Sequence, residues 1–415
     1  MTKLLLSAST LVTALGAGRQ ATLQALREER CGLEPCAFAE VTGGHVGRVH
    51  GLEEAGLGEA GAGEAGAGEA GLGDRFAHFD CRNNRLAALA LRQDGFEAAV
   101  RAAAARHGAG RVAVVCGTST SGILSAENAY RARDPASGLL PAWFRYDGSY
   151  DLFSLSRYVA ERLGLEGPAM TVSTACASSA RAVLDAAQLI EAGVADAAVV
   201  GGADSLCRLT LRGFASLELV SPERCRPFDR DRRGLSVGEA AGFALLERPD
   251  DVPEAANGGI VLSGAGASSD GFHMSSPRPD GEGAVLAMRA ALARAGLAAE
   301  EIDHINLHGT GTRANDLMEG HAVRALFGDR PVACASSKGL TGHCMGSSGI
   351  VEALIAALCL EEGLLPRSFG LVDPDPEIPI RPLTETRSAH LRHVMSNSFG
   401  FGGVNVSLVL SRAQA

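Results

Sequence analysis

Apolar runs of strand length alternate along the chain with segments whose apolar residues recur at helical spacing. The runs RVAVVCGTS, DAAVVGGADS, GFALLER and DHINLHGTGT predict buried strands. Helical spacing follows TVSTACASS, and a separate helical segment ends near Leu326. Strands that are apolar on both faces are typical of parallel sheets with helices on both sides. The pattern therefore predicts an α/β protein with a largely parallel sheet.

The chain start and a break near its middle define the expected organisation. The opening residues, MTKLLLSASTLVTALGAG, resemble a secretory signal, but four hydroxyl residues interrupt the apolar run. We expect a first β-strand followed by a loop. The polar, proline-containing segment ERPDDVPEAANG interrupts the pattern later. We therefore expect two α/β halves, residues 1–250 and 256–415.

Residues 51–74 differ in composition from everything around them. They read GLEEAGLGEAGAGEAGAGEAGLGD, with six acidic residues and neither aromatic nor β-branched side chains. Such a segment buries too little apolar surface to offset its conformational entropy. We expect a flexible acidic surface loop.

Composition excludes several classes of protein. The 415 residues are 46% hydrophobic and 21% charged, which is typical of a globular protein, and the net charge of −10 disfavours nucleic acid as a partner. No stretch is long and apolar enough to span a membrane. The ten cysteines are scattered without a CxxC pair, which favours reduced thiols in a cytoplasmic protein.

Cys176 is a candidate nucleophile. It lies in TVSTACASSARAVLDAAQLIEAG, where an extended run becomes a helix that ends at Gly193. A helix N-terminus favours a thiolate over a thiol and offers N–H donors to an oxyanion. Small neighbours leave room for a substrate. A buried cysteine that only fills the core fits this segment equally well.

Two histidine-containing segments follow. His304 and His308 are expected on or beside one strand, about 13 Å apart, which argues against a shared metal ion. His343 lies in SSKGLTGHCMGSSGIVEA, where it is a second candidate or a loop histidine bonded to backbone groups. Lys338 in the same segment is one of only two lysines among 38 basic residues, so this position favours an ammonium that Glu352 can pair with.

The C-terminal segment HVMSNSFGFGGVNVSLVLSR is expected to form a strand, a sharp glycine turn and a second strand. Gly400, Gly402 and Gly403 allow positive φ and close backbone approach. Phe399 and Phe401 are placed on that turn, where aromatic rings can gate a pocket.

Together these segments resemble a known family. STACASSA, HGTGTRAND, SSKGLTGHCMGSSGIVEA and NSFGFGGVN resemble, in order and spacing, the β-ketoacyl-[acyl-carrier-protein] synthases of the thiolase superfamily. RPFDRDRRGLSVGEAAGFALLER resembles a further signature, apart from Arg233 and Leu235. The resemblance implies the thiolase-like duplicated α-β-α-β-α five-layer fold. It also implies an acyltransferase that condenses an acyl thioester with malonyl carrier protein.

The resemblance further implies roles for individual residues. Cys176 would carry the acyl group, and the backbone N–H groups of Cys176 and Phe401 would form the oxyanion hole. His308 and His343 would promote decarboxylation, with Lys338 and Glu352 organising the pocket. Thr310 and Thr312 would bind the pantetheine arm. Phe401, helped by Phe399, would gate entry to the pocket. The resemblance implies neither a cofactor nor a metal ion.

The resemblance also implies partners and leaves alternatives open. The partners are an acyl carrier protein and a second ketosynthase-like chain, in a homodimer or a heterodimer with a chain-length-factor-like subunit. The pathway could make fatty acids, polyketides or aryl polyenes. Alternatively, the chain serves as the partner or regulatory subunit of such a heterodimer. Basic residues near the acidic repeat are expected to dock the carrier, namely Arg75, Arg82, Arg85 and Arg92.

Overall fold

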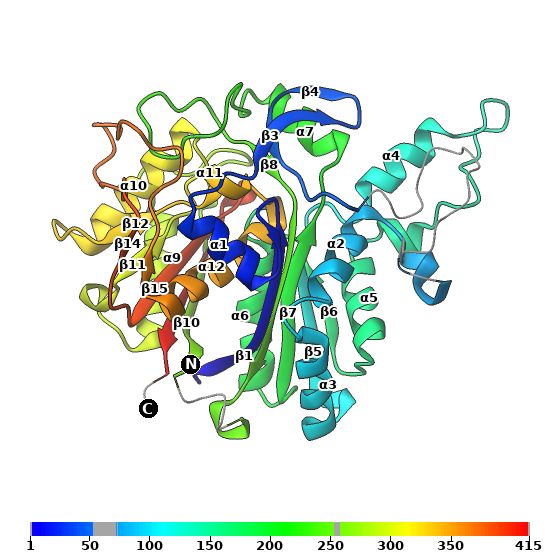
Figure 1. Cartoon of the computed structure of the whole chain (residues 1–415), viewed down its shortest axis with the longest axis horizontal. Helices are drawn as coiled ribbons and strands as arrows, with labels where there is room; N and C mark the ends of the chain where they lie inside the picture. Colours follow the sequence, from blue (N-terminus) through cyan, green and yellow to red (C-terminus); the bar gives the residue numbers. More distant parts are fainter. Residues whose placement is uncertain (1, 53–71, 73, 253–257, 414–415) are drawn as a thin grey trace.

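The central feature of the computed structural model is an 11-stranded sheet (Figure 1). Residues 2–52, 72, 74–252 and 258–413 are described, so most of the predicted acidic loop lies outside them. The sheet consists of two sets of five strands that meet at β1 and β10, with β2 (Gly16–Ala17) attached to β1. The N-terminal set is β1 (Leu4–Thr13), β5 (Val112–Gly117), β6 (Ala169–Val172), β7 (Ala197–Asp204) and β9 (Ala240–Glu247).

The C-terminal set repeats the arrangement of the first. Its strands are β10 (Ile260–Ser269), β11 (His304–Asn306), β12 (Ala333–Ala335), β15 (His393–Phe399) and β16 (Val404–Arg412). The order β6-β5-β7-β9-β1 in one set matches β12-β11-β15-β16-β10 in the other. This correspondence is the expected duplication. The predicted boundary falls between β9 and β10, and the division into two domains stays a prediction.

Strand direction differs from the sequence-based expectation. In each set only the outer three strands are parallel, whereas β9, β1, β10 and β16 pair antiparallel with their neighbours. The prediction of a largely parallel sheet was wrong because helices also cover the antiparallel strands. β9 is buried along its whole length and therefore has the continuous apolar pattern of a parallel strand.

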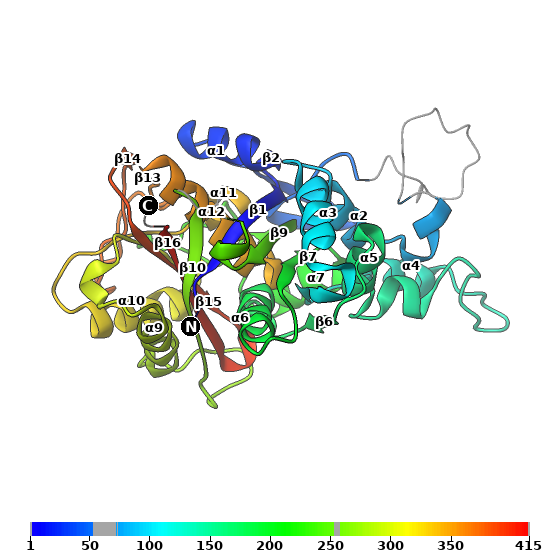
Figure 2. The same ribbon diagram turned by 90° about the horizontal axis from the view of Figure 1, so that it is seen from below.

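Helices form three layers around the two halves of the sheet (Figures 1 and 2). The middle layer is α6 (Ser178–Glu191) and α12 (Ser348–Glu362), which contact each other and the strands of both halves. α12 is buried from Ser348 to Leu360 because its sequence is apolar on nearly every side. The outer layers are α2 (Arg82–Leu91), α3 (Phe96–His107) and α5 (Ser154–Leu163) on one side, and α9 (Glu282–Ala295) and α10 (Arg313–Phe327) on the other.

Four further helices and two small sheets surround this layered core. The helices are α1 (Arg19–Arg27), α4 (Ile123–Arg131), α7 (Arg208–Ser216) and α11 (Lys338–Thr341). Two small sheets contain β3 (Leu33–Phe38), β4 (Val41–Gly47) and β8 (Val237–Gly238), and β13 (Leu364–Leu365) and β14 (Arg387–Ser388). β1 confirms the expected strand at the chain start, and β15, a glycine turn and β16 confirm the expected hairpin.

Candidate active site

Cys176 lies on a sharp turn between β6 and α6, which begins two residues later. The residue before it, Ala175, has a φ of 50°, a left-handed conformation that is strained for alanine. The hydroxyl of Ser178 stabilises this turn by donating to the carbonyl of Ala175 at 2.6 Å and accepting from the N–H of Thr174 at 2.9 Å. The placement just before a helix N-terminus is therefore confirmed.

The protonation state of Cys176 differs from the expectation. Burial raises the pKa of the Cys176 thiol to about 11, although the N–H of Phe401 and the charge of Lys338 both act to lower it. The helix N-terminus was expected to favour a thiolate. That expectation was wrong for the unreacted protein because the side chain is only 6% exposed and desolvation of the thiolate outweighs the favourable groups.

His343 lies beside Cys176, with its Nε2 atom 3.1 Å from Cys176 Sγ. Hydrogen bonds to β8 and to Ser236, the residue before β8, hold the backbone of His343. The His343 N–H donates to the Ser236 carbonyl, and the His343 carbonyl accepts from the Gly238 N–H. The Met345 N–H donates to Nδ1 at 3.2 Å. Because this nitrogen accepts a hydrogen bond, the ring proton of neutral His343 is on Nε2 and faces Cys176.

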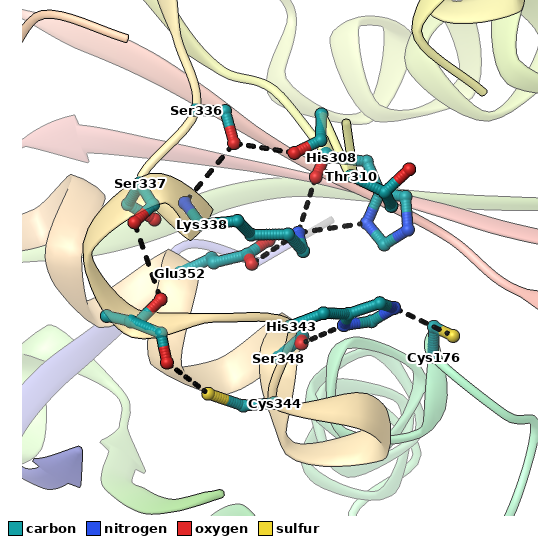
Figure 3. A network of polar contacts seen from close by, with 12 residues as sticks. Cys176, His308, Thr310, Ser336, Ser337, Lys338, His343, Cys344, Ser348 and Glu352 are labelled. Atoms are coloured by element: carbon teal, nitrogen blue, oxygen red, sulfur yellow. Dashed lines mark hydrogen bonds and ion pairs between the residues drawn. The ribbon is translucent and has the colours of Figure 1, made fainter. Parts of the chain in front are cut away.

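His308 faces His343, and their ring centroids are 5.3 Å apart at an interplanar angle of 86°. Figure 3 shows Lys338 between His308 and Glu352. Its ammonium is 2.5 Å from Glu352 Oε1 and 3.3 Å from His308 Nδ1, and it donates to the His308 carbonyl. An ammonium has only hydrogens to offer, so His308 Nδ1 is also an acceptor and Nε2 carries the proton.

Both imidazoles are neutral in this environment. Burial and the nearby ammonium of Lys338 lower the pKa values of His308 and His343 well below their usual range. Burial raises the pKa of Glu352 to about 7, an effect that Lys338 opposes. The expected pairing of Lys338 with Glu352 is present. The arrangement provides two Nε2–H donors beside a thiol.

The sequence analysis missed two buried carboxylates that hold the His308 loop. Glu319 accepts from the backbone N–H groups of His308 and Gly309, each at 2.8 Å, and Asp316 accepts from those of Thr310 and Gly311. Both acidic residues lie in α10, directly after this loop. Acidic residues that follow a glycine-rich loop on the buried face of the next helix were the available signal.

A cavity of about 100 Å³ connects these side chains. The cavity is lined by Cys176, His308 and His343, by Thr310 and Thr312, and by the glycine turn. Gly402 and Gly403 have positive φ there, whereas Gly400 is needed for close approach to Ala177.

The two expected gating residues have different environments. Phe399 is buried at the end of β15, with its ring 6.0 Å from that of His308. Phe401 lies on the turn itself, and its ring packs 5.9 Å from that of Phe214 in α7, an aromatic residue that the sequence analysis missed. Phe214, Phe399 and Phe401 all line the cavity.

Two of the arginines expected to dock a carrier are buried in ion pairs. Arg82 binds Glu239 at 2.5 Å and Arg85 binds Asp80 at 2.5 Å. The expectation that Arg82 and Arg85 dock a carrier was wrong, because both side chains are buried and bind these carboxylates instead of facing solvent. Arg75 and Arg92 are exposed.

Among the described residues, no group of three or more histidine, cysteine, aspartate or glutamate side chains is arranged to hold a metal ion. His304 is buried within β11. No helix within the described residues has the length and apolar character needed to cross a bilayer. All ten cysteines are free thiols.

Family models match both halves of the chain. The N-terminal domain model of beta-ketoacyl synthases matches residues 76–252, and the C-terminal domain model matches residues 260–371. These two matches cover more than half of the sequence, and they contain Cys176, His308 and His343.

Individual relatives agree with the family models. The 3-oxoacyl-[acyl-carrier-protein] synthase 2 of Rhizobium meliloti is 41% identical over 61% of this chain, a match that spans 63% of that relative's length. Nodulation protein E of Rhizobium sp. strain N33 is 34% identical over 79% of this chain and 81% of its own. A structural neighbour is a chain from the solved complex of the ketosynthase ApeO with its chain length factor ApeC from Xenorhabdus doucetiae. It has a TM-score of 0.83 and 37% identity, over 99% of this chain and 98% of the solved one.

The repeated sheet order, the shared middle layer of helices and the cysteine beside two histidines define a thiolase-like protein. Within that class, the chain belongs to the beta-ketoacyl synthase family.

Proposed function

We propose that this chain is a β-ketoacyl-[acyl-carrier-protein] synthase, an acyltransferase that performs decarboxylative condensation. The observation that carries the proposal is the 3.1 Å approach of His343 Nε2 to Cys176 Sγ, with the His308 ring beside it. The named activities of the relatives support the same reaction class. A purely regulatory subunit would not need this arrangement.

The first half-reaction transfers an acyl group to Cys176. The sulfur attacks the carbonyl of an acyl-pantetheine thioester, the pantetheine sulfur leaves, and the proton of the thiol passes to the leaving sulfur. The N–H groups of Cys176 and Phe401 would stabilise the oxyanion. Thr310 and Thr312, whose hydroxyl oxygens are 2.9 Å apart in the cavity lining, would bind the pantetheine arm.

The second half-reaction forms the carbon–carbon bond. A malonyl thioester would place its carbonyl oxygen against the Nε2–H groups of His308 and His343. Loss of carbon dioxide leaves an enolate that these donors stabilise. Its carbon attacks the acyl-Cys176 carbonyl, and the Cys176 thiolate leaves with the pair of electrons. Lys338 keeps His308 neutral by its positive charge and orients the ring.

The proposal includes the partners and the compartment. The substrate carrier would be an acyl carrier protein in the cytoplasm. ApeO was solved with a chain length factor, which supports assembly of this chain with such a subunit or with a second copy of itself. Phe401, helped by Phe399, would gate the cavity between the two half-reactions.

Substitution of the proposed nucleophile tests the division of labour. Cys176→Ala is expected to abolish acyl transfer and condensation while malonyl carrier protein is still decarboxylated, because the two histidines remain. Release of labelled carbon dioxide and mass spectrometry of the protein measure the two activities. Full condensation by this variant would show that Cys176 is not the nucleophile.

A further inference from the structure

Ser348, the first residue of α12, contacts the catalytic machinery through His343. Its hydroxyl oxygen lies 3.0 Å from His343 Nδ1, and its side chain is buried (Figure 3). Nothing in the proposed mechanism uses this hydroxyl. The contact is on the side of the ring opposite to Cys176, so Ser348 acts on the histidine and not on a substrate.

The direction of this hydrogen bond follows from the Met345 contact. Since the Met345 N–H donates to the same nitrogen at 3.2 Å, Nδ1 carries a lone pair and no hydrogen. The Ser348 hydroxyl therefore donates to Nδ1 as well. Two donors on that lone pair stabilise the neutral ring and oppose its protonation.

We infer that Ser348 is a positioning residue for His343, which orients the ring and keeps its proton on Nε2, where a developing enolate needs a donor. This inference rests on the proposed role of His343 in decarboxylation. Such support of a histidine through its second nitrogen is a general way to fix its tautomer and orientation.

The neighbouring serine provides a matched control. Ser347 is also buried, and its hydroxyl donates to the backbone carbonyl of Cys344 at 2.7 Å. Replacement of Ser347 or Ser348 by alanine removes the same atoms from adjacent buried positions. Only the Ser348 change removes a donor from the catalytic ring.

The two variants are compared in the Cys176→Ala background, where decarboxylation occurs without condensation. Ser348→Ala is expected to lower kcat for malonyl carrier decarboxylation about five- to tenfold with little change in KM, because one hydrogen bond to the ring is lost. Ser347→Ala is expected to match the parent. Equal kcat values for both variants, with normal folding, would overturn the inference.

The pH profile separates positioning from a general structural effect. The groups that face His343 are Cys176, His308 and Lys338, with Asp204 bound to the Gly346 N–H in the same loop. Loss of the hydroxyl donor makes protonation at Nδ1 less unfavourable, so the pKa of His343 rises. In the plot of decarboxylation rate against pH, the acidic limb should move to higher pH in Ser348→Ala and stay in place in Ser347→Ala. An unmoved limb contradicts the inference.

A measurement on the unsubstituted protein covers the case in which Ser348→Ala does not fold. Side-chain ¹⁵N NMR, assigned with His343→Asn, should show His343 protonated at Nε2 and unprotonated at Nδ1 near neutral pH. A proton on Nδ1 would overturn the inference. This result does not depend on turnover, so failure of Cys176→Ala to release carbon dioxide refutes the proposed function separately.

Discussion

Lys338 shows how one buried side chain organises the site. It is fully buried, and its ammonium contacts Glu352 and both the ring and the carbonyl of His308. A compact ammonium can point all of its hydrogens at closely spaced acceptors, whereas a guanidinium is planar and larger. These contacts therefore explain why position 338 carries a lysine in a sequence that otherwise uses arginine almost throughout.

Lys338→Arg is expected to fold but to lose condensation activity by roughly a hundredfold, because a displaced His308 ring no longer reaches the enolate oxygen. Steady-state kinetics with malonyl and acyl carrier protein measures the loss. Lys3→Arg is the matched control, since Lys3 is the only other lysine and is exposed. Unchanged turnover in Lys338→Arg would show that only a positive charge matters there.

At the scale of elements, the crossing of α6 and α12 positions Cys176 relative to His343. α6 begins two residues after Cys176 and α12 begins five residues after His343, and the two helices contact each other in the middle layer. Gly349 lies at the contact, where an added Cβ would come within 2.6 Å of Ala180 Cβ and of its backbone nitrogen. The two helices can therefore approach this closely only because residue 349 has no side chain beyond a hydrogen atom.

Gly349→Ala should push the helices apart and destabilise the fold by about 1–3 kcal/mol, as overpacking typically does. It should also reduce condensation more than malonyl decarboxylation, because condensation needs Cys176 and the histidines together. Denaturant unfolding and the two activity assays measure these effects. Gly213→Ala in α7 is the control, since no atom lies within 4 Å of its added Cβ. Wild-type stability and activity in Gly349→Ala would contradict this account of the crossing.

At the scale of the whole molecule, docking of the proposed carrier protein would depend on exposed charge. Of the four arginines expected near the acidic repeat, Arg82 and Arg85 are held in buried ion pairs, and Arg75 and Arg92 are exposed. The acidic residues of segment 51–74 could compete with an acidic carrier for the exposed pair. Such competition acts across about a Debye length, roughly 8 Å at physiological salt, and is screened by added salt.

Excision of residues 56–71, which keeps the buried Leu72 in the core, is expected to leave the fold intact and to lower the KM for carrier-bound substrate at low ionic strength. At high ionic strength the KM should equal that of the full chain, because screening removes the competition. Kinetics at two salt concentrations measures both values. An unchanged KM at low salt would make the segment a passive insertion.

The sequence by itself determined the features that depend on local pattern. Continuous apolar runs predicted the strands at 112–117, 197–204 and 240–247, because burial of a strand requires apolar side chains wherever it faces other layers. The glycine turn near Phe401 and the helix after Cys176 were also predicted, since backbone conformation and capping follow from neighbouring residues.

Only the tertiary structure decided features that depend on distant partners. Strand direction is set by pairing between segments far apart in the chain, and Arg82 finds Glu239 157 residues away. Burial of Cys176 by all surrounding layers outweighs its local position before a helix and raises its pKa. In each case the deciding energy, desolvation or a hydrogen bond, comes from contacts that a local pattern does not contain.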